Sequence, residues 1–289
     1  MAIDFDALLN WRFDEQEHEV TRRDTILYAL GVGLGSSACD RNQLAFVYEQ
    51  GLRSLPTMAV VLGYRGFWMK DPATRIDWKQ VLHVGQAITL YGDLPVEGRI
   101  LSRQRVSALI DKGRQSGAIL AIERDIHQLD GSLLARVEQI SILRGDGGFG
   151  RASGTVAPPP TLPERAPDCQ IDLPTLEQSA ILYRLSGDYN PLHIDPDVAT
   201  AAGFPRPILH GSCTFGVIGH AVLKAFAEYH PERIRSLGGR FTTPVYPGET
   251  IRTELWLEGE TRAYLRARSL QRDLVVFDRG CAELIVPVD

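Results

Sequence analysis

Residues 218–226, Ile-Gly-His-Ala-Val-Leu-Lys-Ala-Phe, are the most apolar part of a segment with helical periodicity that runs from Ser212 to Tyr229. The helix is expected to end near His230-Pro231, because proline cannot continue a helix. A helix this apolar must be buried on most of its sides. Strand-like segments follow it at residues 234–243, 250–258, 264–270 and 274–285. A curved antiparallel sheet wrapped around one buried helix satisfies both patterns, whereas a doubly wound α/β fold would need helices to alternate with strands.

The first half of the chain carries a similar order of elements. A helical pattern around residues 25–32 and a short capped helix at Asp77–Leu82 come first. Strands are then expected at residues 87–90, 99–110, 118–129 and 133–143. In each half the series of strands opens at a Pro/Gly turn, at residues 94–98 and 245–249. We interpret the chain as a diverged duplication of one α+β unit.

A Gly/Pro-rich stretch separates the two halves. Residues 145–160 contain five glycines and end in three prolines, and further prolines follow at 163 and 167. Glycine adds flexibility and proline prevents regular strand pairing, so this stretch is expected to be a surface linker. The predicted organisation is an N-terminal domain at 1–150, a linker at 151–168 and a C-terminal domain at 169–289.

The overall composition narrows the class of protein. The 289-residue chain has a net charge of −5, so it lacks the basic field of a nucleic-acid-binding protein. Its apolar runs fall short of the ~20 residues that a membrane-spanning helix needs. Its four cysteines are scattered without metal-type spacing, and the C-terminal residues form no peroxisomal targeting tripeptide. We therefore expect a cytoplasmic globular protein that binds neither nucleic acid nor membranes.

Residues 183–211 supply the candidate chemistry. They include Ser-Gly-Asp-Tyr-Asn-Pro-Leu-His at 186–193 and Ile-Leu-His-Gly at 208–211. An acid, Asp188, and an imidazole, His193, stand five residues apart, and Gly211 opens the apolar helix. Such a set suits proton transfer next to a carbonyl group. By composition alone, however, the same residues also fit a plain turn followed by a helix that Asp195 caps.

This block resembles the MaoC-like, R-specific enoyl-CoA hydratase family, also called hydratase 2. Further matching segments in the second half are Gly203-Phe204, Pro207–Gly211, Cys213–Gly216 and Pro244–Gly248, and weaker matches in the first half are His83, Asp111–Gly113 and Gly147–Gly150. The resemblance covers nearly the whole chain and is strongest to the two-domain form that ends peroxisomal multifunctional enzymes of type 2. It implies a double hot dog fold, with two antiparallel sheets each curved around a long helix. It also implies a hydro-lyase that adds water to trans-2-enoyl-CoA, giving (3R)-3-hydroxyacyl-CoA, without a metal or redox cofactor.

The expected catalytic residues are Asp188, His193, Asn190 and Gly211. Histidine changes protonation near neutral pH, so His193 would activate a water molecule for attack on Cβ of the substrate. Asp188 would share that water and exchange a proton with it or with Cα. The Gly211 N–H, at the start of the helix, would stabilise charge on the thioester oxygen. Asn190 would orient Asp188 or His193, and His210 is expected to hold the turn before the helix.

The substrate is expected to contact residues from both halves. These are His83, Lys112, Tyr189, Pro191, Leu192, Arg240 and Phe241, and the resemblance places His83, Lys112 and Phe241 near acyl-CoA. Val84 separates His83 from Gly85, whereas relatives have glycine directly after the histidine, which leaves the local geometry open. The first half lacks an Asp-x-Asn-Pro-x-His string, so it is expected to shape the acyl tunnel, with residues 55–68 accommodating a long or bulky chain.

Two alternative functions stay open at this point. Proteins of the resembled fold also act on branched, dicarboxylic or sterol side-chain acyl-CoA, and the sequence leaves the acyl preference undecided. A thioesterase-like or merely acyl-CoA-binding hot dog protein is the alternative from another class, although the intact Asp188, Asn190 and His193 argue against binding alone. Acyl-CoA is the expected partner, and two chains are expected to pair as a homodimer.

Overall fold

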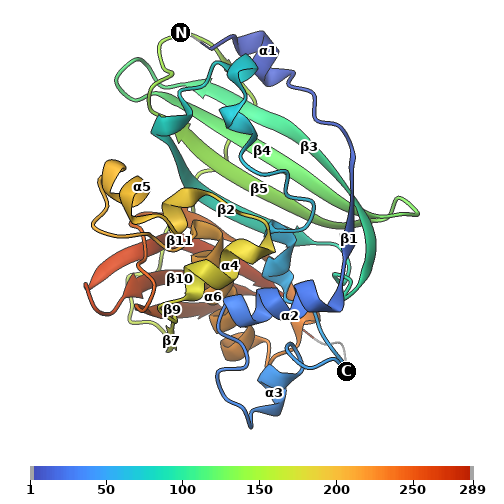
Figure 1. The fold of residues 1–289 in the computed structure, drawn as a ribbon. Helices are drawn as coiled ribbons and strands as arrows, with labels where there is room; N and C mark the ends of the chain where they lie inside the picture. The colour runs from blue at the N-terminus through green and yellow to red at the C-terminus, as the bar shows by residue number, and fades with distance from the viewer. Residues whose placement is uncertain (1–2, 287–289) are drawn as a thin grey trace.

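One antiparallel sheet runs through the whole molecule in the computed structural model, which describes residues 3–286 (Figure 1). Its strands in the first half are β1 (Gln16–Val20), β2 (Val81–Leu90), β3 (Gly98–Asp111), β4 (Ala118–Gln128), β5 (Leu133–Leu143) and β6 (Ala152–Ser153). Those in the second half are β7 (Cys169–Pro174), β8 (Ile234–Phe241), β9 (Thr250–Glu258), β10 (Arg262–Ser269) and β11 (Leu274–Leu284). Residues 287–289, which bear on the targeting-signal expectation, lie outside the described part of the chain.

The two halves have the same strand topology. The sheet order is β1-β3-β4-β5-β2-β8-β11-β10-β9-β7, with β6 paired to β3. Counted outward from the β2–β8 junction, each half places its second strand first, then a meander of three strands, then its short first strand at the edge. The predicted α+β double hot dog is confirmed, and its repeated topology agrees with the predicted duplication. The edge strands β1 and β7 were not expected, because they are short and only partly buried.

The junction between β2 and β8 turns two half-sheets into one. Five residue pairs form the ladder, from Gly85↔Arg240 to Thr89↔Ser236. At its centre, a Cβ on Gly238 would lie 2.7 Å from the Cβ of Ala87, so the glycine permits the close approach of the strands. The register of β2 shifts between His83 and Gly85, which makes a β-bulge at Val84.

The helices are unequally divided between the halves. They are α1 (Phe5–Leu9), α2 (Arg22–Gly31), α3 (Arg41–Leu44), α4 (Ser179–Tyr183), α5 (Pro196–Ala201) and α6 (Gly211–Phe226). Single 3₁₀ turns are η1 (Pro56–Val60), η2 (Trp68–Lys70), η3 (Pro72–Thr74), η4 (Trp78–Gln80), η5 (Arg184–Ser186), η6 (Pro191–His193) and η7 (Pro231–Arg233). The predicted long helix is present as α6, which is buried from Cys213 to Leu223.

The first half lacks a helix of comparable length within residues 3–150, and here the structure differs from the expectation of a long helix in each sheet. Its longest helix, α2, packs against α4 of the second half. The following segment contains Gly51, Gly63 and Gly66 at positive φ, which interrupts any continuous helix. The short helix expected at Asp77–Leu82 is only the turn η4, because its last two residues already belong to β2.

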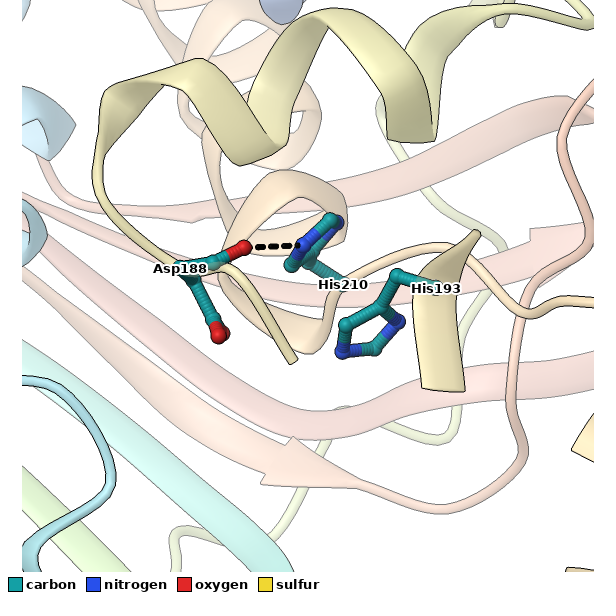
Figure 2. Close-up of side chains that lie close together, drawn as sticks. All are labelled: Asp188, His193 and His210. Atoms are coloured by element: carbon teal, nitrogen blue, oxygen red, sulfur yellow. Dashed lines mark hydrogen bonds between the residues drawn. The ribbon is translucent and has the colours of Figure 1, made fainter. Parts of the chain in front are cut away.

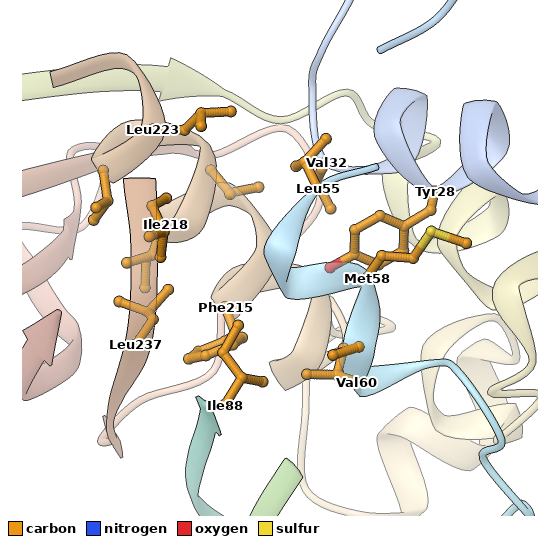
Figure 3. Packing of buried hydrophobic residues seen from close by; sticks show 14 of the residues in the cluster. Tyr28, Val32, Leu55, Met58, Val60, Ile88, Phe215, Ile218, Leu223 and Leu237 are labelled. Atoms are coloured by element: carbon orange, nitrogen blue, oxygen red, sulfur yellow. The ribbon is translucent and has the colours of Figure 1, made fainter. Parts of the chain in front are cut away.

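The larger of two apolar clusters crosses both halves, and the smaller one lies within the first half. Figure 3 shows Tyr28, Leu55 and Met58 of the first half packed beside Phe215 and Ile218 of α6. The contact is close: a Cβ on Gly219 would lie 2.4 Å from Cγ2 of Thr57. Helix α6 is therefore covered by first-half residues as well as by its own sheet.

The segment between the halves is extended and largely irregular. Within the predicted linker, β6 pairs with β3, and residues 154–168 form no helix or strand. Arg240 donates to the carbonyl oxygen of Ala157 at 3.2 Å, which fixes the segment against β8. The predicted domain boundaries stay predictions, since the halves share one sheet and the larger apolar cluster. Among the described residues, no helix combines the length and the apolar character needed to cross a membrane.

Candidate active site

The loop between α4 and α6 carries the candidate catalytic side chains. Gly187, with φ of 117°, ends η5 and turns the chain toward Asp188. Asn190 then caps η6 through its side-chain oxygen, which accepts a hydrogen bond from the amide of Leu192 at 3.2 Å. Because η6 ends at His193, the Asn-Pro turn brings that imidazole back toward Asp188.

Asp188, His193 and His210 form one cluster, in which the nearest polar side-chain atoms all lie within 4.8 Å of one another. Figure 2 shows the Asp188 carboxylate and the His193 ring extending to the same side. The Nδ1–H of His193 donates to the carbonyl oxygen of Ile208 at 2.8 Å, and this leaves Nε2 free to accept a proton. Burial lowers the pKa of His193, against the opposing effects of the Ile208 hydrogen bond and the Asp188 charge. The imidazole is thus neutral at pH 7.

His210 contacts both other members of this cluster. Its ring stacks on that of His193 with centroids 3.7 Å apart. Its Nε2–H donates to the backbone carbonyl of Asp188 at 3.1 Å, as the dashed line in Figure 2 marks. Burial lowers the pKa of His210 to about 3, with His193 acting in the same direction. The contacts agree with the expected structural role of His210, and they add a direct link to both Asp188 and His193.

The expectation that Asn190 orients Asp188 or His193 stays a prediction, and the structure shows how its groups are used. Its side chain caps η6 and does not contact the side chain of Asp188 or His193 in the described structure. Its backbone amide instead donates to the Asp188 carboxylate at 3.2 Å. Asn190 therefore acts through the turn that it shapes, because the amide dipole and the turn geometry decide where Asp188 and His193 point.

Gly211 opens α6 beside two other predicted site residues. No side chain caps this helix start, and within residues 3–286 the Gly211 amide donates no hydrogen bond. The Phe241 ring lies against Gly211, and the His83 ring meets Phe241 edge-on with centroids 4.9 Å apart. The Nε2–H of His83 donates to the Gly85 carbonyl, and burial lowers the pKa of His83 to about 4, so this imidazole is neutral.

Other predicted substrate contacts are not brought to this cluster by any contact in the described residues. Lys112 is exposed on a turn that Asp111 holds by accepting hydrogen bonds from the amides of Gly113, Gly148 and Gly150. Tyr189 is 59% exposed and lies under the guanidinium of Arg184. Pro191 is exposed, and Leu192 is half-buried beside His193 in η6. Arg240 faces Ala157 of the linker segment.

Tyr64 of the first half is affected by the charge of Asp188, although no catalytic motif in the sequence marks it. Burial raises the pKa of its phenol, and the negative charge of Asp188 raises it further. The residue stands in Gly63-Tyr64-Arg65-Gly66, where an aromatic and a cation flanked by glycines could have marked it within the segment at 55–68.

A metal ion would find three donors here, since Asp188, His193 and His210 are close enough to hold one. One nitrogen of each imidazole donates a proton to a backbone carbonyl, which leaves the other nitrogen of each ring free.

Comparisons with known proteins agree with this geometry. The MaoC-like domain family matches residues 159–275, and the N-terminal domain family of MFE-2 hydratase 2 matches residues 18–145. The chain is 40% identical over 277 residues to 3-hydroxyacyl-thioester dehydratase Y of Mycobacterium tuberculosis, covering 92% of this chain and 93% of that protein. It is 38% identical to the peroxisomal enoyl-CoA hydratase 2 of Arabidopsis thaliana, covering 88% and 87%.

A solved structure is similar over the full length. The MaoC-like dehydratase of Phytophthora capsici superposes with a TM-score of 0.88 at 30% identity, covering 99% of this chain and 100% of that one. Sequence and fold thus match the same proteins over both halves. The chain belongs to the MaoC-like hydratase 2 family.

Proposed function

We propose that this protein is an (R)-specific 2-enoyl-CoA hydratase, a hydro-lyase that interconverts trans-2-enoyl-CoA and (3R)-3-hydroxyacyl-CoA. The observation that carries the proposal is the pairing of the half-buried Asp188 carboxylate with the buried, neutral His193 ring, next to the Gly211 amide, which donates no hydrogen bond among the described residues. The names of relatives that match over both halves, enoyl-CoA hydratase 2 and 3-hydroxyacyl-thioester dehydratase, support it.

The chemistry follows from these positions. A water between Nε2 of His193 and the Asp188 carboxylate would lose a proton as its oxygen attacks Cβ, and Cα would gain a proton from the same pair. Because Asp188 and His193 can share protons, we assign the roles of acid and base to the pair before either residue. The Gly211 amide, at the positive end of α6, would donate to the thioester oxygen as negative charge develops there.

The proposal requires no metal or redox cofactor, because water addition transfers no electrons and the polarising groups come from the chain itself. The proposed partner is an acyl-CoA thioester, and the proposed state is a cytoplasmic homodimer. Light scattering on the purified protein measures the number of chains. Several relatives are peroxisomal by name, so localisation needs a direct test with a tagged full-length chain.

The test is hydration of crotonyl-CoA and trans-2-decenoyl-CoA, followed by loss of enoyl-thioester absorbance, with product chirality read by R- and S-specific dehydrogenases. Asp188→Asn and His193→Gln should each lower kcat/KM by about 10²–10⁴-fold while circular dichroism and Tm stay close to wild type. Asp197→Asn, an exposed acid on the neighbouring helix α5, is the matched control and should retain activity.

Other outcomes separate the alternatives. A folded wild-type protein that hydrates no enoyl-CoA, or makes the S product, contradicts the proposal. Release of free CoA, detected with a thiol reagent, would assign a thioesterase instead. A comparison of linear, branched, dicarboxylic and sterol side-chain substrates then settles which acyl group is preferred.

A further inference from the structure

The cluster of Asp188, His193 and His210 has a chemical capability that the proposed hydration does not use. One donor atom from each of the three side chains lies within 4.8 Å of the other two (Figure 2). Two imidazole nitrogens and a carboxylate oxygen are donors that zinc favours in proteins. Within residues 3–286, no other group of three or more such side chains is close enough to hold a metal ion.

His193 has the arrangement of a metal-binding histidine. Its Nδ1–H donates to the Ile208 carbonyl at 2.8 Å, which fixes the ring and leaves the lone pair on Nε2. Histidines that bind metals usually hold their second ring nitrogen by a hydrogen bond of this kind, which sets the tautomer. Burial lowers the pKa of His193, so at neutral pH no proton has to leave Nε2 before a metal ion binds there.

His210 supplies a second buried nitrogen beside the first. Its Nε2–H donates to the Asp188 carbonyl at 3.1 Å, and its Nδ1 is buried without a hydrogen-bond partner among the described residues. The residue is only 1% exposed, and its ring stacks on that of His193 with centroids 3.7 Å apart. A buried acceptor without a donor is unfavourable, and a bound cation would satisfy it.

Asp188 supplies the anionic donor and can move toward the rings. Its carboxylate accepts a single hydrogen bond within the described part of the chain, from the Asn190 amide at 3.2 Å. Zinc–ligand bonds are about 2.0–2.2 Å long, so the donors around one ion lie about 3.5 Å apart. Donors within 4.8 Å therefore have to close by roughly 1 Å, which a rotation of the half-buried Asp188 side chain can supply.

A metal ion at this position would compete with catalysis. In the proposed reaction, Nε2 of His193 and the Asp188 carboxylate exchange protons with the water and with the substrate. A zinc ion bonded to Nε2 occupies the lone pair that would accept the proton, and its charge keeps the carboxylate ionised. The cluster can therefore bind zinc or exchange protons, but it cannot do both at once.

We propose that Asp188, His193 and His210 form a reversible zinc site, and that bound Zn²⁺ inhibits the enzyme by occupying its acid–base pair. The ion is an inhibitor in this scheme, and the reaction itself needs no metal. The inhibition rests on the proposed hydratase function, whereas zinc binding does not depend on it. Mg²⁺ should not act in the same way, because it favours oxygen ligands and the cluster offers a single carboxylate.

Zinc binding is measured by calorimetry on the purified protein, in a buffer without thiols or chelators and with Mg²⁺ as the comparison ion. Asp188→Asn, His193→Gln and His210→Phe each remove one donor. Each should weaken zinc binding by at least the roughly 10- to 100-fold that is lost when a hydrogen-bonded neighbour of a metal ligand is replaced. A wild-type crystal soaked in zinc needs no variant, since anomalous scattering should place the ion among the three side chains.

Matched variants identify zinc that binds elsewhere. Cys39 is an exposed thiol, and the His230 ring pairs with Glu232 at 2.9 Å, so Cys39→Ser and His230→Gln each remove a donor outside the cluster. Both variants should bind zinc at the cluster as tightly as wild type. An ion found only outside the cluster overturns the proposal, as does zinc binding that all three cluster variants leave unchanged.

Inhibition is measured as the rate of crotonyl-CoA hydration at buffered concentrations of free Zn²⁺. Zinc should abolish wild-type activity, and a chelator should restore it. His210→Phe is the decisive variant, because it keeps Asp188 and His193 and therefore part of the activity. Half-inhibition of this variant should need at least roughly 10-fold more zinc than half-inhibition of wild type. Zinc that binds at the cluster without inhibiting, or that accelerates hydration, overturns the inhibition.

A failure of the proposed hydratase function would look different. Wild type would then hydrate no enoyl-CoA with or without zinc, whereas calorimetry and anomalous scattering would still find the ion at the cluster and support the zinc site. An active hydratase that binds no zinc at the cluster keeps the proposed function and overturns the zinc site.

Discussion

The rings of His193 and His210 stack with their centroids 3.7 Å apart and their planes inclined by 28°. The same His210 holds the backbone carbonyl of Asp188 through Nε2. One buried ring thereby sets the positions of both groups that are proposed to handle protons. His210 is a positioning residue, because it acts through Asp188 and His193.

Replacing His210 should separate its two contacts. His210→Phe keeps a ring against His193 but loses the hydrogen bond to Asp188, and kcat should fall by about 3- to 10-fold, as for one lost hydrogen bond, with little change in KM. His210→Gln keeps a donor but loses the stacked ring. Steady-state kinetics on crotonyl-CoA measures both. Unchanged kcat in both variants would show that His210 serves only to fill space.

Gly211→Ala should lose activity without losing stability. Gly211 does not adopt a positive φ, and an added Cβ would meet only the Phe241 ring at 3.5 Å, an ordinary contact. The fold therefore tolerates alanine, whereas a methyl group beside the proposed oxyanion donor would displace the thioester. Misplacement by about 1 Å can cost ~10²-fold in rate. Thermal unfolding measures the stability of the variant, and kcat/KM measures its activity. A stable variant with full activity would show that the Gly211 amide takes no part in the mechanism.

Stability should fall as the pH drops below about 6.5. Burial lowers the pKa of His210 to about 3 and the pKa values of His83 and His220 to about 4. At pH values between these lowered pKa values and the ordinary histidine pKa, the three histidines are protonated in the unfolded chain but not in the folded chain. Each histidine then costs up to about 1.4 kcal/mol per pH unit. The stability they contribute is complete above pH ~6.5 and is lost progressively toward pH ~4.

Urea unfolding at a series of pH values measures this slope. His220→Gln should reduce it, because one buried titrating group is removed while a hydrogen-bonding side chain remains near Tyr229. His230→Gln is the comparison variant, since this histidine is only half-buried and its ring pairs with Glu232 at 2.9 Å outside the apolar core. An acid slope that His220→Gln does not alter would mean that other groups dominate.

Gly219→Ala should destabilise the joint between the halves. Its Cβ would lie 2.4 Å from Cγ2 of Thr57, and overpacking of this kind typically costs about 1–3 kcal/mol. Thr57→Ser removes the clashing methyl group, so Gly219→Ala in that background should be nearly neutral, or stabilising through the higher helix propensity of alanine. Denaturant unfolding of the two single variants and the double variant gives the coupling energy. If the effects of the two single substitutions on stability simply add in the double variant, the contact between residues 219 and 57 is contradicted.

Much of the local structure could be predicted from the sequence. The period-two segments at 133–143 and 250–258 match β5 and β9 in both bounds. The helix predicted from Ser212 matches α6 to within a few residues at each end. The turn from Asp188 to His193 could also be predicted, because Asn190 and Pro191, which shape it, lie within it. The edge strands β1 and β7 alternate but are only five and six residues long, which gave too little signal for the same treatment.

The sequence by itself determined which segments could be strands, which helix had to be buried and which turn carried acid and base, because hydrophobic period and turn chemistry act between near neighbours. Only the tertiary structure decided that β2 joins β8 and that His210 stacks on His193. These contacts join residues far apart in the chain, and they depend on the register of strands and on glycines that let backbones approach. No local pattern encodes such pairings, because their energy appears only when both partners are in place.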